Sequence, residues 1–259
     1  MKLKELTGAI EKVAPLSIQD SFDNSGLQVG FPEQEIESVL ICLDVTEEVV
    51  AEAEKLGCQL ILSHHPLLFH PLKMVSNTTY QQRCTVRAIK AGIAIYSAHT
   101  SLDNARGGVN YKIADAIGMD GLSWLSAKES SDAGSGVIGE LRSPLTDNEF
   151  LLMLKDRFVV HALRHSATSG KTIRKVAICG GAGAFLLPEA IRKGADCFVC
   201  GEFHYHDYFE NSGVLLAELG HYESEQFTQV LLHDILTEAF PGISARISGT
   251  YTNPINCLI

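Results

Sequence analysis

The sequence has few basic residues and no long apolar run. Lysine and arginine number 21 against 31 aspartates and glutamates, which gives the 259-residue chain a formal net charge of −10. An acidic surface repels phosphate backbones, so nucleic acid is not expected as a partner; a ring threaded by DNA would need lysines concentrated in its hole. No apolar stretch approaches the roughly 20 residues of a membrane-spanning helix, so no membrane partner is expected either.

The sequence also shows no sign of a secretory signal or of a disulfide framework. Met1–Ser17 carries a charge every few positions and has no apolar h-region. The seven cysteines are odd in number and scattered, which favours reduced thiols and a cytoplasmic location. Cys197 and Cys200 form a CxxC pattern, but they lie in an apolar run that predicts a strand. Residues i and i+3 of a strand point to opposite faces, so we interpret both as core thiols.

The apolar residues, 46% of the chain, gather in short continuous runs separated by helical patterns. Continuous runs are typical of parallel strands covered on both faces. The runs lie at Ser38–Leu43, Leu60–Leu62, Ile93–Tyr96, Lys175–Cys179, Cys197–Cys200 and Val214–Leu219. The alternation predicts an α/β fold with short, mostly parallel sheets flanked by helices.

Capping signals mark the expected helices. Thr46 can cap a helix that Gly57 ends. A second helix is expected over Gln81–Ala91 and a third over Ala184–Lys193. The pattern Thr146-Asp147-Asn148-Glu149 is a capping box that opens a helix through about Arg157.

The order of elements predicts two interlinked α/β halves, 1–125 and 126–259. Ser126–Gly136, rich in serine, alanine and glycine, is expected to connect them, and Gly136–Leu141 is a possible strand. The last helix is expected to pack back on the first half.

Polar residues gather where the predicted strands end. Open α/β sheets bind ligands outside the carboxyl ends of their strands. These segments are Asp44, Ser63–Pro66, Ser97–Asp103, Gly201–Asp207 and Gly220–Glu225. Histidine, aspartate and glutamate together have the composition of a metal site, although a His-His pair alone also suits a hydrogen-bonded loop.

The donor count favours two ions. His221 and Glu225 are four residues apart, so they share one face if Gly220 starts a helix. With Asp103, the segments supply three imidazoles and two carboxylates, more than the roughly three protein ligands of one catalytic zinc. Two ions about 3.5–4 Å apart would use the set and lower the pKa of a bridging water. Because these donors come from both halves, we expect the dinuclear site between them.

The same segments resemble the GTP cyclohydrolase I type 2 homologue family, also called the Nif-three-like dinuclear metal-centre family. The resemblance runs from about residue 20 to residue 225. It rests on Phe22–Gly30, Leu43–Thr46, Ser63–Leu67, His99–Asp103, Gly180–Gly183 and Gly220–Glu225.

The resemblance implies a ligand set, a reaction and an assembly. The implied ligands are His64, His65, Asp103, His221 and Glu225, binding two divalent ions such as zinc, iron or manganese. The implied assembly is a homohexamer. The family name implies attack of a metal-activated water on C8 of guanine, ring opening and loss of formate.

Other residues are candidates for catalysis and substrate binding. His99 or His204 could carry protons, and each is equally suited to hydrogen bonding behind the metal site. Arg106 could contact a substrate phosphate. The Gly180–Gly183 turn could present backbone N–H groups to phosphate, although a tight turn is the more frequent role of such glycines.

Two functions from different classes follow. The first is a metal-dependent hydrolase that acts on a small, nucleotide-like or phosphorylated substrate. The second is a non-catalytic metal-binding protein that buffers or delivers metal or serves as a regulatory partner. Open coordination positions for water favour the first.

Overall fold

The computed structural model describes residues 1–128 and 132–258, which form two compact units. The first unit comprises Met1–Leu102 and Thr228–Pro254, and the second begins at Asp103 and runs to Phe227, with the last residues of the chain assigned to it. Among the described helices, none combines the length and apolar character that crossing a bilayer requires.

The first unit is built on a five-stranded sheet of order β1-β4-β3-β2-β11. Its strands are β1 (Gly26–Val29), β2 (Ser38–Cys42), β3 (Leu60–Ser63), β4 (Ala94–Ser97) and β11 (Ser244–Ile247). The four strands β4, β3, β2 and β11 are parallel, and β1 runs antiparallel to β4. In β2, β3 and β4 almost every residue is buried, as the continuous apolar runs predict.

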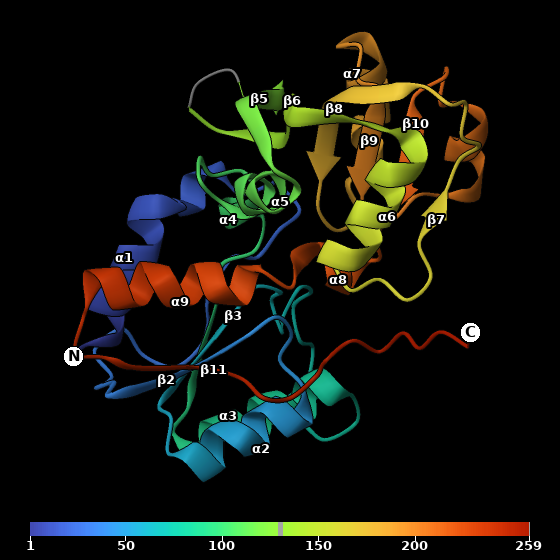
Figure 1. Cartoon of the computed structure of the whole chain (residues 1–259). Coiled ribbons are helices and arrows are strands. Elements are labelled where there is room, and N and C mark those ends of the chain that lie inside the picture. Colours follow the sequence, from blue (N-terminus) through green and yellow to red (C-terminus); the bar gives the residue numbers. More distant parts are fainter. Residues whose placement is uncertain (129–131, 259) are drawn as a thin grey trace. The chain divides into compact units, whose positions relative to one another are not determined.

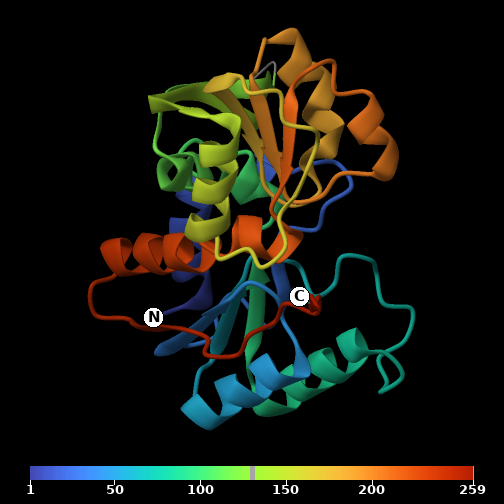
Figure 2. The same cartoon turned by 45° about the vertical axis from the view of Figure 1, so that its right-hand side comes forward.

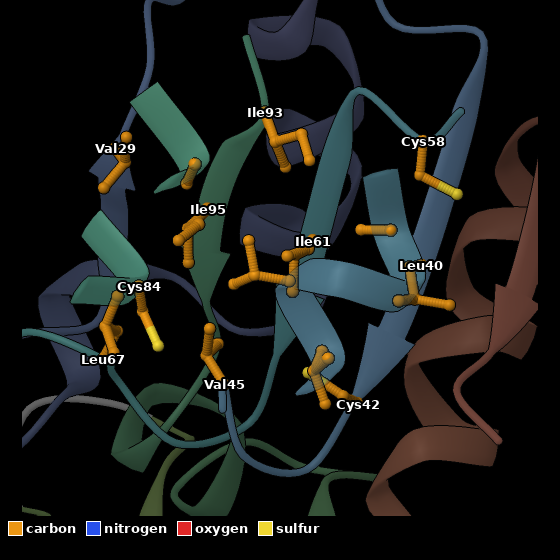
Figure 3. Close-up of a cluster of buried hydrophobic side chains, with 14 residues drawn as sticks. Val29, Leu40, Cys42, Val45, Cys58, Ile61, Leu67, Cys84, Ile93 and Ile95 are labelled. Atoms are coloured by element: carbon orange, nitrogen blue, oxygen red, sulfur yellow. The ribbon is translucent and has the colours of Figure 1, made fainter. Parts of the chain in front are cut away.

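Helices cover both faces of this sheet (Figure 1). The helices are α1 (Leu3–Val13), α2 (Glu47–Leu56), α3 (Tyr80–Ala91) and α9 (Thr228–Ala239). As predicted, Thr46 caps α2, and Gly57 ends it in the left-handed conformation. The helices α2 and α3 lie side by side beneath the sheet in Figures 1 and 2, while α1 and α9 pack together on its other face. Figure 3 shows the cluster of buried side chains between the sheet and the helices α2 and α3, which includes Leu40, Ile61, Ile95 and Cys84.

The second unit is built on a six-stranded sheet of order β5-β6-β8-β9-β10-β7. Its strands are β5 (Met119–Ala127), β6 (Gly134–Thr146), β7 (Arg164–His165), β8 (Thr172–Cys179), β9 (Cys197–Cys200) and β10 (Leu215–Glu218). Only the pairs β8–β9 and β9–β10 of this sheet are parallel. Both sheets are therefore mixed, and the α/β class is confirmed.

Helices also cover the second sheet. They are α5 (Val109–Ile117), α6 (Asp147–Arg157), the 3-10 helix Gly183–Leu186, α7 (Leu187–Arg192), the 3-10 helix Tyr205–Phe209 and α8 (His221–Glu225). The capping box of Thr146 and Glu149 opens α6 as predicted. The expected helix over Ala184–Lys193 is instead a 3-10 turn followed by α7, with a proline in the first turn of α7.

The two compact units divide the chain at other positions than the expected halves, 1–125 and 126–259. The first unit ends at Leu102 and not near residue 125, because β5 forms a hairpin with β6 in the second sheet. The chain later returns to the first unit, where α9 contacts α1 and β11 pairs with β2. Of the expected connection Ser126–Gly136, residues 129–131 lie outside the described residues.

The CxxC pattern lies within β9, where all four residues are buried. Burial raises the pKa of the Cys197 thiol well above its ordinary value and that of Cys200 to about 12. Both thiols therefore stay protonated near neutral pH. The prediction of core thiols at these positions is confirmed.

Candidate metal centre

Three histidines of the first unit follow the carboxyl ends of adjacent parallel strands. His64 and His65 come directly after β3, and His99 follows β4 by two residues. The strand register pairs Ser63 with Ser97, so both strands end at the same level. Backbone hydrogen bonds continue beyond the strands, and the His65 N–H donates to the Leu43 carbonyl at 2.9 Å. The parallel sheet therefore positions imidazoles that are 34 residues apart in sequence at one edge.

The three rings form a compact cluster. The ring centroid of His64 lies 4.8 Å from that of His65 and 5.4 Å from that of His99, and the last two are 5.5 Å apart. One ring nitrogen from each residue lies within 4.8 Å of the other two. Such a spacing allows imidazoles to share one divalent cation, since Zn–N bonds are about 2.0–2.1 Å.

Each ring is oriented through its Nδ1 atom. His64 Nδ1 lies 3.1 Å from the Ala98 carbonyl oxygen, which can only accept a hydrogen bond. His65 Nδ1 lies 2.7 Å from Asp44 Oδ1, and His99 Nδ1 lies 2.7 Å from Asp23 Oδ1. With Nδ1 as donor, the neutral ring carries its lone pair on Nε2. This arrangement is typical of metal-binding histidines.

Asp23 is the carboxylate behind His99, and its side chain is fully buried. Its Oδ2 accepts from Ser25 Oγ at 2.7 Å, from the Thr100 backbone N–H at 3.0 Å and from Thr100 Oγ1 at 2.6 Å. Burial raises the pKa of Asp23, but hydrogen bonds from His99 and Thr100 outweigh this and lower it well below the ordinary range. Asp23 is therefore ionised at neutral pH and holds His99 in one orientation.

Asp44 plays the corresponding part behind His65. Burial raises the pKa of this carboxyl, but the hydrogen bond with His65 and a second one from Thr252 together lower it below its ordinary value. Asp44 and His65 also line a pocket of about 380 Å³. Two further carboxylates and a tyrosine contribute to its wall, namely Glu47, Glu48 and Tyr80.

The second unit carries its own group of donors. His221 and Glu225 lie on one face of α8, as predicted, with His221 Nε2 3.3 Å from Glu225 Oε2. Carboxylate oxygens of Asp103, the last residue of α4 (Thr100–Asp103), and Glu225 lie within 4.8 Å of each other. Glu225 is buried, whereas one-third of the His221 side chain is exposed.

Close packing positions these donors. The turn after β8 passes so near α8 that a Cβ on Gly181 would lie 2.4 Å from Glu225 Oε1. Asn110 of α5 donates to the Asp103 carbonyl at 3.1 Å and accepts from the Gly180 N–H at 3.0 Å. A glycine at position 181 is needed both for this approach and for its φ of 58°.

The donor chemistry of both groups fits a divalent cation. The first unit offers imidazole nitrogens with their orientation fixed by acceptors behind them, and the second offers two carboxylates beside one imidazole. Nitrogen and oxygen donors of this kind suit zinc, iron or manganese. Cations could polarise a substrate and activate water there.

The other sequence candidates have different surroundings. His204 precedes the 3-10 helix Tyr205–Phe209, and 92% of its side chain is exposed. Arg106 forms two hydrogen bonds with Asp132, of 2.5 and 2.6 Å, so a substrate phosphate would have to compete with that carboxylate.

The glycine turn after β8 is a packing feature. The N–H groups of Gly180 and Gly181 donate to Asn110 and to Ser224 Oγ, both at 3.0 Å. These two N–H groups are thus engaged within the protein, and the phosphate-binding interpretation of the turn is not supported at either residue.

Sequence reasoning gave no role to several residues behind the donors. Asp23, which precedes β1, lies behind His99, and Glu202 Oε1 lies 3.2 Å from His221 Nδ1. The sequence indicates for Asp44 a position after a predicted strand and within the segment Leu43–Thr46, but no contact with His65. The available signal was position, because Asp44 and Glu202 lie within two residues of the ends of β2 and β9.

A family model described as Duf34/NIF3 (NGG1p interacting factor 3) matches residues 1–254. This chain belongs to the Duf34/NIF3 family. The resemblance seen in the sequence motifs is thereby confirmed.

Several proteins match the chain over most of its length. A Clostridium perfringens protein named GTP cyclohydrolase 1 type 2 homolog is 37% identical over 229 residues, which cover 87% of each chain. A Lactococcus lactis protein of the same name is 34% identical over 98% of each chain. The crystal structure of the Staphylococcus aureus hypothetical protein SA1388 superposes with a TM-score of 0.92 at 27% identity, covering 100% of this chain and 99% of that one.

Proposed function

We propose that this protein is a metal-dependent hydrolase with a dinuclear centre that acts on a small, nucleotide-like or phosphorylated molecule. The proposed ligands of two divalent ions are His64, His65, Asp103, His221 and Glu225. The names of the Clostridium perfringens and Lactococcus lactis relatives support a reaction of the GTP cyclohydrolase type.

The observation that carries this proposal is the orientation of the histidine cluster. The Nδ1 atoms of His64 and His65 face protein oxygens at 3.1 and 2.7 Å, so Nε2 is the ring nitrogen of each that would bind a cation. His99 is oriented in the same way by Asp23, at 2.7 Å, and is not one of the proposed ligands. His64 is completely buried, and burying an imidazole costs more free energy than burying an apolar side chain of similar size, so packing alone does not favour histidine at this position.

The chain's own residues would position substrate and move protons. When bound, the ions would supply Lewis-acid chemistry and an activated water. His99, with its Nδ1 held by Asp23, is the proposed proton carrier, exchanging protons at Nε2. His204 and Arg106 remain proposals as a second proton carrier and a phosphate contact.

The pocket beside His65 supports a small substrate. Its volume of about 380 Å³ lies in the range of small-molecule sites, roughly 300–1,000 Å³. Its wall includes the carboxylate of Glu48, a group whose oxygens accept hydrogen bonds. The N–H groups of a nucleobase are complementary to such acceptors.

A turnover screen tests the proposal. The full-length protein, loaded with zinc, iron or manganese, is incubated with a metabolite mixture that includes GTP, and the products and released formate are identified by mass spectrometry. His64→Ala and Asp23→Asn serve as impaired variants. Turnover that is lost in His64→Ala supports a hydrolase. Metal binding without turnover of any metabolite would instead indicate a protein that buffers or delivers metal.

The remaining proposals concern assembly and location. We propose a homohexamer that functions in the cytoplasm with a small-molecule substrate. Sedimentation velocity of the purified protein would give about six times the chain mass of 28.2 kDa if the hexamer forms. A sedimenting monomer or dimer would contradict it.

A further inference from the structure

The chain segment Ser248–Pro254, here called the C-terminal segment, continues from β11 and is fixed against α2. Its first residue donates its N–H to the Ile41 carbonyl at 2.7 Å, which extends the pairing of β11 with β2. Glu52 of α2 then accepts hydrogen bonds from Ser248 Oγ at 2.6 Å, the Gly249 N–H at 2.9 Å and Thr250 Oγ1 at 2.7 Å. Figure 1 shows this segment, in red, running beside α2.

Two residues beyond this anchor, the segment reaches the carboxylate behind His65. Thr252 Oγ1 donates to Asp44 Oδ2 at 2.7 Å, and the other oxygen of Asp44 lies 2.7 Å from His65 Nδ1. A continuous chain of hydrogen bonds therefore joins the C-terminal segment to the histidine cluster, although Thr252 and Asp44 are 208 residues apart in sequence.

The two bonds act on opposite oxygens of one carboxylate. An aspartate side chain rotates readily about its terminal torsion, which is broad and roughly two-fold. A partner on Oδ2 restricts that rotation and so fixes the direction in which Oδ1 meets His65. Threonine suits this role because its branched Cβ restricts its own side-chain rotation.

The C-terminal segment also forms part of the pocket wall. Thr252 and Pro254 line the same pocket of about 380 Å³ as His65, Asp44 and Tyr80. The hydroxyl of Thr252 therefore lies where it affects both the orientation of a proposed metal ligand and the shape of the adjoining cavity.

We propose that Thr252 is a positioning residue that holds His65, through Asp44, in the orientation needed to bind a cation. The part of this proposal that concerns the cation rests on the proposed function. The part that concerns the orientation of His65 stands on the hydrogen bonds alone.

The test compares Thr252→Val, which removes the hydroxyl but keeps the shape, with Thr252→Ser, which keeps the hydroxyl. Thr250→Val is the matched control, because it removes a hydroxyl from the same segment that bonds Glu52 instead of Asp44. Side-chain ¹⁵N resonances of His65 are recorded in the metal-free protein and assigned with His65→Gln. Zinc affinity is then measured by competition with a chelator.

We expect Thr252→Val to shift the His65 Nδ1 resonance and to lower zinc affinity about threefold to tenfold. Loss of a group that hydrogen-bonds a metal ligand directly typically lowers metal affinity about 10–100-fold, and Thr252 acts on His65 only through Asp44. Thr252→Ser should restore both, and Thr250→Val should change neither. An unchanged His65 resonance in Thr252→Val, or an equal shift in Thr250→Val, would overturn the proposal. If wild-type protein binds no zinc, the proposed function fails, whereas the resonance measurement still decides the role of Thr252.

Discussion

Replacing Asp23 by asparagine should destabilise the protein even when no metal is present. The two carboxylate oxygens accept five hydrogen bonds. Oδ2 accepts from Ser25 and twice from Thr100, and Oδ1 accepts from His99 and the Asn24 N–H. An asparagine keeps only one acceptor oxygen, so its NH₂ group must face donors on one side. Whichever way the amide is turned, at least one backbone N–H, that of Asn24 or that of Thr100, faces the NH₂ group and loses its acceptor, and the remaining bonds no longer have a charged partner.

The size of the effect follows from these bonds. Hydrogen bonds to a charged group contribute about 1.5–3 kcal/mol each and neutral ones about 0.5–1.5 kcal/mol, so one lost bond and several weakened bonds would together cost about 3–6 kcal/mol. A neutral amide is less costly to bury than a carboxylate, which offsets part of that loss. We therefore expect the free energy of unfolding to fall by about 2–4 kcal/mol.

Urea unfolding of the metal-free protein measures this change. Far-UV circular dichroism follows both units, whereas fluorescence of the single tryptophan, Trp124 in β5, reports on the second unit. The control is Glu33→Gln, which makes the same chemical change at an exposed ion pair with Lys4 in the first unit. Exposed pairs contribute about 0–1 kcal/mol. An Asp23→Asn variant as stable as Glu33→Gln would refute the reasoning.

Three further predictions concern the second unit and pH. Glu225→Gln should lower the affinity for the zinc ion that binds second more than the affinity for the one that binds first, because the flexible carboxylate of Glu225 is the proposed bridge between the two cations. Calorimetric titration that finds both affinities reduced equally would contradict this. Gly181→Ala should lower zinc affinity at least tenfold, because the added Cβ displaces Glu225, whereas Gly170→Ala, with a similar positive φ but open space around it, should leave the affinity unchanged in the same titration. Burial raises the pKa of Glu52, but hydrogen bonds from the C-terminal segment lower it below 4.5, so its contribution to stability is present above pH 4.5 and lost below. The difference in unfolding free energy between wild type and Glu52→Gln should therefore shrink as the pH falls below 4.5; a constant difference would show that Glu52 is not responsible.

The sequence predicted the elements whose causes are local. Thr46 and Gly57 bound α2 through contacts within a few residues, and His221 and Glu225 share a face of α8 because helical geometry puts positions i and i+4 together. The strand-end rule also grouped His64 with His99, since adjacent parallel strands end at one edge of the sheet.

What the sequence did not show depends on contacts between distant residues. Asp23 meets His99 only because β1 turns back antiparallel to β4, and the two are 76 residues apart. Thr252 reaches Asp44 only because β11 joins the edge of the first sheet beside β2. Neither pairing leaves a periodic pattern in the sequence, so neither could be read from composition or spacing.

The content of metal per chain tests the central claim most directly. Protein is saturated with zinc at neutral pH, freed of unbound metal by gel filtration and analysed for zinc and protein together. We predict about two zinc ions per chain in the wild type and fewer in His64→Ala and in Glu225→Gln, with Cys197→Ser unchanged. At most one ion per chain, or zinc that is lost from Cys197→Ser and retained by His64→Ala, would contradict the account.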